Sequence, residues 1–317
     1  MNKSRLAASP LLCALLVTGL VACSDPPPPP AAAPPPPVSQ DVRTFSIGAM
    51  TGIVLRDGSL ELPNDNKVLG VGRTPAEVAD LLAAAGLPTD KLMLSIQPLL
   101  VRVGGRVMLF DTGAGTGMGE GAGKLGASLA EAGITPDSIT DIFISHLHGD
   151  HVGGLIDAAG DPVFANATVR LSETEWQTLR GLNDRTAAGF GLSRHTEIAR
   201  AIEPAVATFK PGAELLPGIV RAVEVKGHTP GHSAFRIGTG GNALLYVGDS
   251  MHHHVVSVQK PEWPIAFDTD AAAAAASRAS LLGELATSGQ RVYAVHFPFP
   301  GLGRIEKRGE GFAWVAE

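Results

Sequence analysis

One dense cluster of chemically active side chains is the stretch SHLHGDHVGG, residues 145–154. It places three histidines and an aspartate within six positions, although the whole chain has only 10 histidines in 317 residues. Core histidines occur singly because each buried ring needs its own hydrogen-bond partners, and a solvated cluster has no reason to follow the apolar run ITDIFI. Neutral imidazole and carboxylate groups bind Zn²⁺ and similar divalent ions. The stretch therefore predicts a metal site formed by His146, His148, Asp150 and His151.

Three further candidates stand where an apolar run gives way to a loop rich in glycine or proline. They are His228 in VKGHTPGHS, Asp249 in LLYVGDS and His296 in YAVHFPFPG. Functional groups commonly occupy such positions, because a rigid strand holds the side chain while the loop leaves it open to a ligand. We therefore expect these three side chains to join the first four.

Seven such groups are too many for one catalytic ion, which takes about three protein ligands and keeps a position open for water. They suit two divalent ions that share a carboxylate, most naturally Zn²⁺, with Mn, Fe or Co as alternatives. Two ions roughly 3.5–4 Å apart can share a hydroxide and make it a nucleophile at neutral pH. The pattern thus predicts hydrolysis by a metal-bridged hydroxide.

The elements that must position these groups follow a mixed α/β order. Apolar or alternating runs predict strands within 44–55, 94–103, 106–113, 141–146, 167–172, 219–228, 234–240, 243–249 and 292–298. Helical patterns cover 75–86, 123–133, 173–179, 195–206 and 271–286. Two sheets packed back to back with helices outside would fit this order, and so would a doubly wound sheet.

The N-terminal residues resemble an export signal. Lys3 and Arg5 precede an apolar stretch that is too short for a comfortable membrane span and ends in LVAC, which resembles a lipoprotein cleavage site. We expect residues 1–22 to be a signal peptide, Cys23 to carry lipid within a proline-rich linker over 23–40, and 41–317 to be the hydrolase domain. An ordinary secretory signal is the alternative. Either way we expect an exported, periplasmic protein, and in the first case its only membrane contact is the lipid anchor.

The composition narrows the chemistry further. The formal charge of -6 gives no basic footprint, so no nucleic-acid partner is expected. Both cysteines, Cys13 and Cys23, fall at the N-terminus, which leaves the predicted domain without a disulfide or a thiolate ligand. Nothing in the sequence sets the oligomeric state.

The motifs HLHGDH, GHTPGH, GD at 248–249 and His296 together resemble the metallo-β-lactamase superfamily, over roughly residues 45–317. The resemblance implies an αβ/βα four-layer sandwich with the metals at one edge of the two sheets. It also implies His146, His148 and His228 on one ion, Asp150, His151 and His296 on the other, and Asp249 between them. The presence of Asp249 and the lack of cysteine ligands disfavour penicillin hydrolysis.

Within the superfamily, FDTGAGTGMG and GHTPGHS are similar to the methyl parathion hydrolase-like branch and its neighbours, the acyl-homoserine lactone lactonases. By this likeness Asp111 orients a ligand histidine, although a plain turn after a strand is the alternative. His252 stands where lactonases have a tyrosine that polarises the substrate carbonyl. Trp176, with Met118 and Phe190, would line the substrate pocket, although Trp176 and Phe190 could equally pack in the core.

The remaining histidines have simpler interpretations. His253 and His254 are expected in a loop, His232 as a support for its own loop, and His195 at the surface or at a helix cap. The segments 155–218 and 50–65 are expected to select the substrate.

The sequence as a whole predicts a dinuclear metal-dependent hydrolase acting on a small lactone or other ester, with Asp150 or a metal-bound water passing a proton to the leaving group. A phosphotriesterase of the same fold is the alternative. A lipid-anchored metal-binding protein without turnover is the alternative from another class.

Overall fold

The computed structural model describes residues 39–317, which form one unit. The expected signal peptide, Cys23 and all but the last two residues of the expected linker lie outside the described residues. Within 39–317, no helix is both long and apolar enough to cross a membrane.

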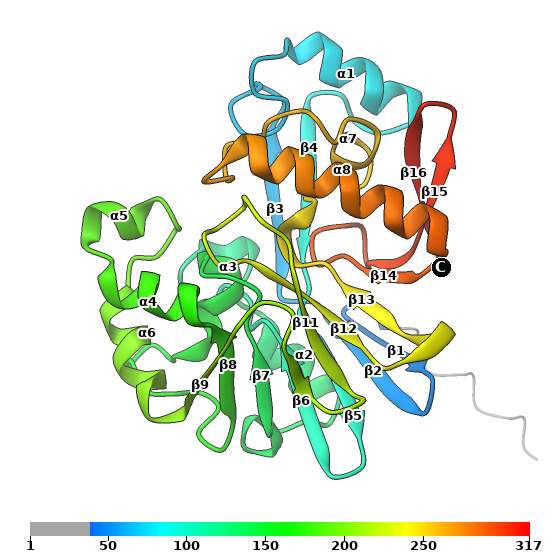
Figure 1. Cartoon of the computed structure of the whole chain (residues 1–317). Helices are drawn as coiled ribbons and strands as arrows, with labels where there is room; N and C mark the ends of the chain where they lie inside the picture. Colours follow the sequence, from blue (N-terminus) through cyan, green and yellow to red (C-terminus); the bar gives the residue numbers. More distant parts are fainter. Residues whose placement is uncertain (1–38) are drawn as a thin grey trace, which may run out of the picture. The chain divides into compact units, whose positions relative to one another are not determined.

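Two seven-stranded sheets organise the chain (Figure 1). The first sheet has the order β1 (Val42–Ile47), β2 (Met50–Leu55), β5 (Leu99–Val103), β6 (Arg106–Phe110), β7 (Asp141–Phe143), β8 (Thr168–Ser172) and β9 (Val206–Phe209). The second has the order β10 (Glu214–Leu216), β11 (Val220–Glu224), β12 (Ser233–Ile237), β13 (Leu244–Tyr246), β14 (Arg291–Tyr293), β15 (Leu302–Arg308) and β16 (Gly311–Ala316). Pairing is parallel along β6–β7–β8–β9 and between β13 and β14, and antiparallel elsewhere in the two sheets.

The helices lie outside the two sheets. They are α1 (Pro75–Ala84), α2 (Leu125–Glu131), α3 (Gly149–Val152), α4 (Glu173–Gly181), α5 (Asp184–Ala188), α6 (His195–Ile202), α7 (Val256–Gln259) and α8 (Ala271–Ser288). Residues at the helix termini determine where α1 begins and where α8 ends. Thr74 and Glu77 form a reciprocal capping box at the start of α1, and Gly289, with a φ of 63°, ends α8 in the left-handed conformation.

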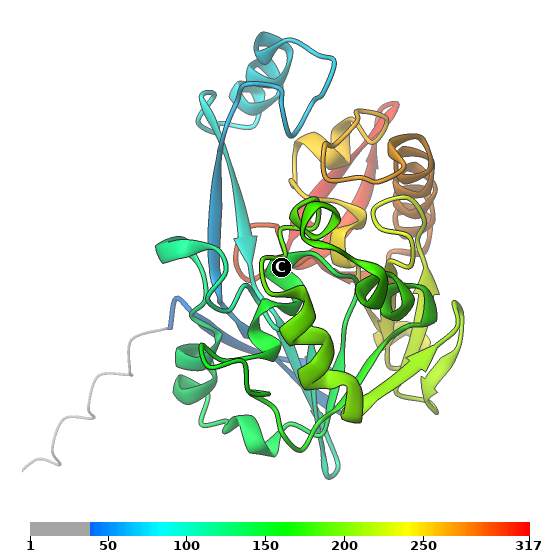
Figure 2. The ribbon, with the colours of Figure 1, turned by 90° about the vertical axis from the view of Figure 1, so that its left-hand side faces the viewer.

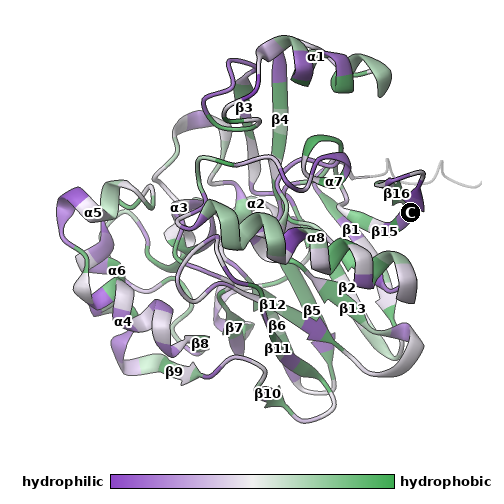
Figure 3. Ribbon diagram, turned by 45° about the horizontal axis from the view of Figure 1, so that its top comes forward, coloured by the Kyte–Doolittle hydropathy of each residue, from purple (hydrophilic) through white to green (hydrophobic). Residues whose placement is uncertain are grey.

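Three apolar layers show how the sheets and helices stack. One core lies between the sheets, because it joins Phe110 and Phe143 of the first sheet to Phe235 and Tyr246 of the second. A second core covers the other face of the first sheet with side chains from α2, α4 and α6, and a third places α8 on the second sheet. Hydrophobic residues accordingly concentrate in the central strands (Figure 3). The order helix, sheet, sheet, helix confirms the αβ/βα four-layer sandwich and excludes the doubly wound sheet.

A small two-stranded ribbon stands apart from both sheets. Strands β3 (Gly58–Pro63) and β4 (Lys91–Ile96) pair only with each other and lead to α1 (Figures 1 and 2). Leu92 and Leu94 of the ribbon pack with Val78 and Leu82 of α1 and with Trp263, which gives this part its own apolar core. The ribbon matters for the site because Leu60 of β3 and Leu94 of β4 reach the cavity described below.

Candidate metal centre

The HLHGDH stretch begins three residues after the end of β7 and runs into the short helix α3. Gly149, between His148 and Asp150, is required by close packing. A Cβ at this position would stand 2.5 Å from the carbonyl oxygen of Gly191, and the Gly149 amide donates to Phe190 O at 2.9 Å. The stretch is therefore held between the end of a buried strand and the loop that follows α5.

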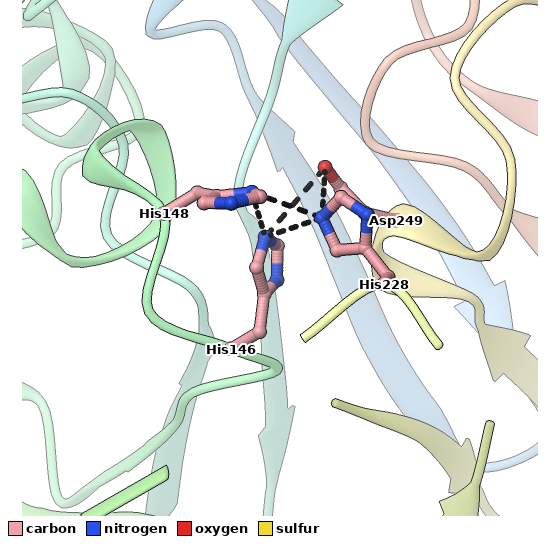
Figure 4. A group of neighbouring side chains, drawn as sticks. All are labelled: His146, His148, His228 and Asp249. Atoms are coloured by element: carbon pink, nitrogen blue, oxygen red, sulfur yellow. Dashed lines mark hydrogen bonds and ion pairs between the residues drawn. The ribbon is translucent and has the colours of Figure 1, made fainter. Parts of the chain in front are cut away.

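Four of the seven predicted side chains converge on one point (Figure 4). His146 Nε2 lies 3.1 Å from His148 Nδ1, and His228 Nε2 lies 3.1 and 2.9 Å from these two nitrogens. Asp249 Oδ2 completes the group, 3.3 Å from His228 Nε2 and 3.6 Å from His146 Nε2. Three ring nitrogens and a carboxylate oxygen aimed at one point make a set of donors for a divalent cation.

The other three predicted side chains form a second group beside the first, made of Asp150, His151 and His296. Asp150 Oδ2 lies 3.7 Å from His151 Nε2 and 3.6 Å from His296 Nε2. Asp249 Oδ1 lies 3.2 and 3.1 Å from the same two nitrogens. One oxygen of Asp249 thus faces each group, which is the geometry of a carboxylate shared by two ions.

The outward ring nitrogens of four of the five ligand histidines are hydrogen-bonded. His146 Nδ1 donates to Ser145 Oγ at 2.9 Å, and His296 Nδ1 donates to Ser95 O at 2.7 Å. His151 Nδ1 donates to Asp111 and His228 Nδ1 to Asp268, at 2.7 and 2.9 Å. These bonds fix the tautomer and leave the Nε2 lone pairs pointing inward, as metal-ligating histidines require.

Two buried atoms of the seven predicted ligands have no hydrogen-bond partner among the described residues: His151 Nε2 and Asp249 Oδ1. An acceptor left alone in a protein interior is costly. A cation between these atoms removes that cost, so the residues present fit a pair of metal ions.

The protonation states of the buried side chains also favour binding of metal ions. Burial lowers the pKa of His146 and His148 well below the ordinary histidine value, so both rings are neutral and available as ligands. Burial would raise the pKa of Asp249, but His151 and His296 outweigh it and hold this pKa well below the usual range. Asp249 is therefore an anion surrounded by imidazole rings.

Asp111 forms the support behind His151. Its carboxylate is buried and accepts from Ser145 N at 2.7 Å, Ser145 Oγ at 2.7 Å and the Tyr246 hydroxyl at 2.6 Å, besides His151. Asp111 directly follows β6, with a φ of 57°, and its carboxylate bonds the outward ring nitrogen of His151.

The other histidines surround the centre at different distances. His252 is brought to it, with Nε2 3.1 Å from Asp249 Oδ2. His232 supports its loop, since it donates to Val225 O and accepts from Asp249 N, at 3.1 and 3.0 Å. His253 accepts the amides of the first turn of α7. His195 begins α6 but is only 5% exposed, so the expectation of a surface position is wrong.

A cavity of about 210 Å³ opens onto the centre. Its wall includes the metal-group residues His148, Asp150, Asp249 and His296, together with His252. The rest of the lining is Leu60, Leu94, Met118, Gly149, Ala188, Gly189, Phe190, Gly191 and Phe267, with neither a cation nor a further anion.

The structure separates the three residues predicted for the substrate pocket. Met118 and Phe190 line the cavity. Trp176 does not: it packs partly buried against the core of the first sheet, and the Arg180 guanidinium lies over its ring at 5.9 Å. Its place in α4 turns the ring toward that core, so the pocket assignment of Trp176 is corrected to core packing.

Sequence reasoning missed several supporting groups. Ser145 stands next to the histidine motif and could have been found there. Asp57, Glu175 and Asp268 belong to no motif. Only the tertiary structure brings Glu175 and Asp268 to His228 and its loop, and Asp57 to the loop that carries Met118. Glu175, for example, accepts from Thr229 Oγ1 at 2.8 Å and Gly231 N at 2.6 Å, which holds the loop that follows His228.

A family comparison agrees with this site. The model of the metallo-beta-lactamase superfamily matches residues 95–288, and the chain belongs to this superfamily. The fold and the paired His/Asp groups define a metal-dependent hydrolase with a dinuclear site.

Solved structures are similar to the chain over most of its length. AidC, a dizinc quorum-quenching lactonase, is 29% identical, with a TM-score of 0.81 over 87% of this chain and 97% of that one. The hydrolase AbOPH of the beta lactamase superfamily is 27% identical, with a TM-score of 0.77 over 87% of this chain and 97% of that one.

Curated relatives match over a shorter stretch. A ribonuclease Z of Salinibacter ruber is 42% identical over 79 residues, which is 25% of this chain and 21% of the relative. A ribonuclease Z of Methanothermobacter thermautotrophicus is 42% identical over 57 residues, 18% of this chain and 16% of that protein. The matched stretch thus spans about a fifth of these relatives or less.

Proposed function

We propose that the protein hydrolyses a small lactone or another carboxylic ester with two divalent ions, Zn²⁺ in the first place. One observation carries the proposal: Asp249 directs one carboxylate oxygen to each of two ligand groups, in which four of the five histidines already have bonded outward ring nitrogens. The likeness to AidC, a dizinc lactonase, supports the choice of metal and of substrate class.

His146, His148 and His228 would hold one ion, Asp150, His151 and His296 the other, and Asp249 both. When bound, such a pair of ions lowers the pKa of a shared water and polarises the carbonyl of an ester. Asp111 and Ser145 keep the histidine rings in the orientation that this binding needs.

The side chains that line the cavity perform the remaining tasks. Asp150 reaches the cavity wall and can pass a proton to the leaving group. His252 also lines the cavity, with Nε2 3.1 Å from Asp249 Oδ2, so this ring lies beside the shared carboxylate. The apolar remainder of the wall admits an uncharged ester and excludes water from the reacting group.

Metal removal tests the proposal. Chelation should abolish turnover of a panel of lactones, aryl esters and phosphotriesters, and Zn²⁺, Mn²⁺ or Co²⁺ should restore it. Turnover that survives complete stripping would refute a metal-dependent mechanism. Phosphotriesters as the fastest substrates would select the alternative phosphotriesterase, and metal binding without turnover of any activated ester would select the binding protein.

Asp249→Ala tests the shared carboxylate directly. We expect elemental analysis to find at least one metal equivalent fewer per chain than in the wild type, because both ions lose a ligand. Asp65→Asn is a suitable control, since Asp65 forms only a surface pair with Lys67. Unchanged stoichiometry in Asp249→Ala would contradict the bridge.

We further propose export with lipid attached to Cys23 and the domain on the periplasmic side of a membrane. The supporting feature is the basic and apolar N-terminal sequence ending in LVAC. Mass spectrometry of the mature chain should find a lipid-modified Cys23 at its N-terminus, and Cys23→Ser should release the protein from membranes. A mature chain that begins elsewhere would refute the anchor.

A further inference from the structure

A buried ion pair lies behind the metal centre, outside the set of predicted ligands. Arg278 on α8 is 1% exposed and is among the largest fully buried side chains of the described residues. Its Nη1 lies 3.6 Å from Asp268 Oδ2, and the Asp268 side chain is fully buried. Buried arginines are rare because the charge must leave water, so this one needs a specific reason.

The two oxygens of Asp268 face in different directions. Oδ2 faces Arg278, whereas Oδ1 accepts the Nδ1–H of His228 at 2.9 Å. A guanidinium beside the carboxylate stabilises its anionic form, and an anionic acceptor keeps the proton on His228 Nδ1. The Nε2 lone pair of His228 is then directed at the ligand group formed with His146 and His148.

Arg278 also holds the segment that leads to Asp268. Its Nε donates to Pro261 O at 2.9 Å and its Nη2 donates to Trp263 O at 3.2 Å. Phe267, next to Asp268, lines the cavity, with its ring centre 5.7 Å from that of His252. One side chain of α8 therefore fixes both the carboxylate behind a ligand and the backbone that presents a wall of the cavity.

We propose that Arg278 is a positioning residue of the metal centre and acts through Asp268 on His228. The inference rests on the proposed function, because it takes His228 as a metal ligand. It extends that function to a residue on a helix that contributes no ligand, 50 positions along the chain from His228.

The test measures Zn²⁺ binding to the metal-free full chain by competition with a chromophoric chelator. Asp268→Asn should weaken one of the two Zn²⁺ sites by roughly 10–100-fold, the usual effect of removing such a support. Arg278→Met should weaken the same site by at least threefold, and Arg278→Lys should recover part of the loss. If Arg278 acts through Asp268, the double variant should bind no more weakly than Asp268→Asn alone.

Leu282→Ala supplies the matched control, because Leu282 is fully buried on the same helix and packs in the core of the second sheet. It should lower the stability of α8 but leave Zn²⁺ affinity within about twofold of the wild type, since Asp268 keeps its contacts to His228 and Arg278. Equal weakening by Leu282→Ala, or effects of Arg278 and Asp268 that simply multiply, would reduce Arg278 to a structural role.

Two further results distinguish a failure of the proposed function from a failure of the role proposed for Arg278. A wild-type chain that binds no Zn²⁺ would overturn the proposed function, whereas normal binding that Arg278→Met leaves unchanged would overturn only this inference. Should Arg278→Met fail to fold, the cycle of Arg278→Lys with Asp268→Asn makes the same comparison.

Discussion

Individual side chains at this centre are defined by which of their atoms remain free. Asp249 N and the outward nitrogens of His151 and His296 are bonded to the protein, whereas Asp249 Oδ1 and His151 Nε2 have no hydrogen-bond partner among the described residues. A buried polar group with only a structural role has the opposite pattern, because all of its hydrogen-bond partners are present. The centre is therefore built for a ligand that the chain itself does not supply.

His253 shows how a neighbouring histidine differs, and it yields a pH prediction. Its Nδ1 accepts from the amides of Val255 and Val256 at 3.2 and 3.3 Å, so this nitrogen must stay unprotonated in the fold. Burial, with the nearby His254, lowers the pKa of His253 to about 3. Below the unfolded pKa of about 6.5 the unfolded chain takes a proton that the folded chain refuses, so stability falls as the pH drops toward 3.

We expect His253→Asn to reduce this pH dependence, because asparagine can accept the same amides without titrating. Between pH 6 and 4 the free energy of unfolding should change less steeply in the variant, by up to about 1.4 kcal/mol per pH unit. Urea unfolding of both proteins in excess chelator at several pH values checks this. Parallel curves would contradict the assignment.

At the scale of elements, loops tied by single buried carboxylates hold the site. Asp57 is fully buried and accepts from Ala114 N and Gly123 N at 3.0 Å and from Leu125 N at 2.9 Å. These bonds connect the end of β2 to the loop that carries Met118 into the cavity wall. The loop is rich in glycine, so little else restrains it.

Asp57→Asn should therefore affect both stability and substrate binding. In asparagine an NH2 donor replaces one of the two acceptor oxygens and faces a backbone N–H group. That N–H group then lacks an acceptor, which costs about 1–3 kcal/mol for a buried polar group. Chemical denaturation should report this loss, and KM should rise more than kcat falls because the wall shifts while the ligands stay. Asp65→Asn serves again as the surface control, and an unchanged KM would show that the loop keeps its place without Asp57.

The helices and strands also show which parts of the fold can be predicted from the sequence. Every predicted helix and strand segment contains an element of its type, because long periodic patterns and caps are local. The strands β3, β9, β10, β15 and β16 and the short helices α3, α5 and α7 were not predicted, since segments of three to seven residues with mixed exposure give little pattern. The seven candidate ligands were predicted from their motifs, but Asp268 and Arg278 were not, because their roles depend on contacts between distant segments.

At the scale of the whole domain, the centre joins the two sheets. His146, His148, Asp150 and His151 follow β7 of the first sheet, whereas His228, Asp249 and His296 follow β11, β13 and β14 of the second. Each proposed ion would take ligands from both sheets. Metal binding should then stabilise the packing of one sheet on the other, in addition to supplying chemistry.

This arrangement predicts a large effect of metal on unfolding. An ion that binds only the folded state adds about 2.7 kcal/mol per site when its free concentration is 100 times the dissociation constant. For a domain of this size that corresponds to roughly 5–10 °C in Tm per site. Calorimetry with Zn²⁺ and with chelator should show this shift in the wild type and in Asp65→Asn, and a smaller one in Asp249→Ala because both sites lose a shared ligand. If Zn²⁺ binds with full stoichiometry yet leaves Tm unchanged, the ions bind the unfolded chain as tightly as the folded one, and the packing of the two sheets is not what holds them.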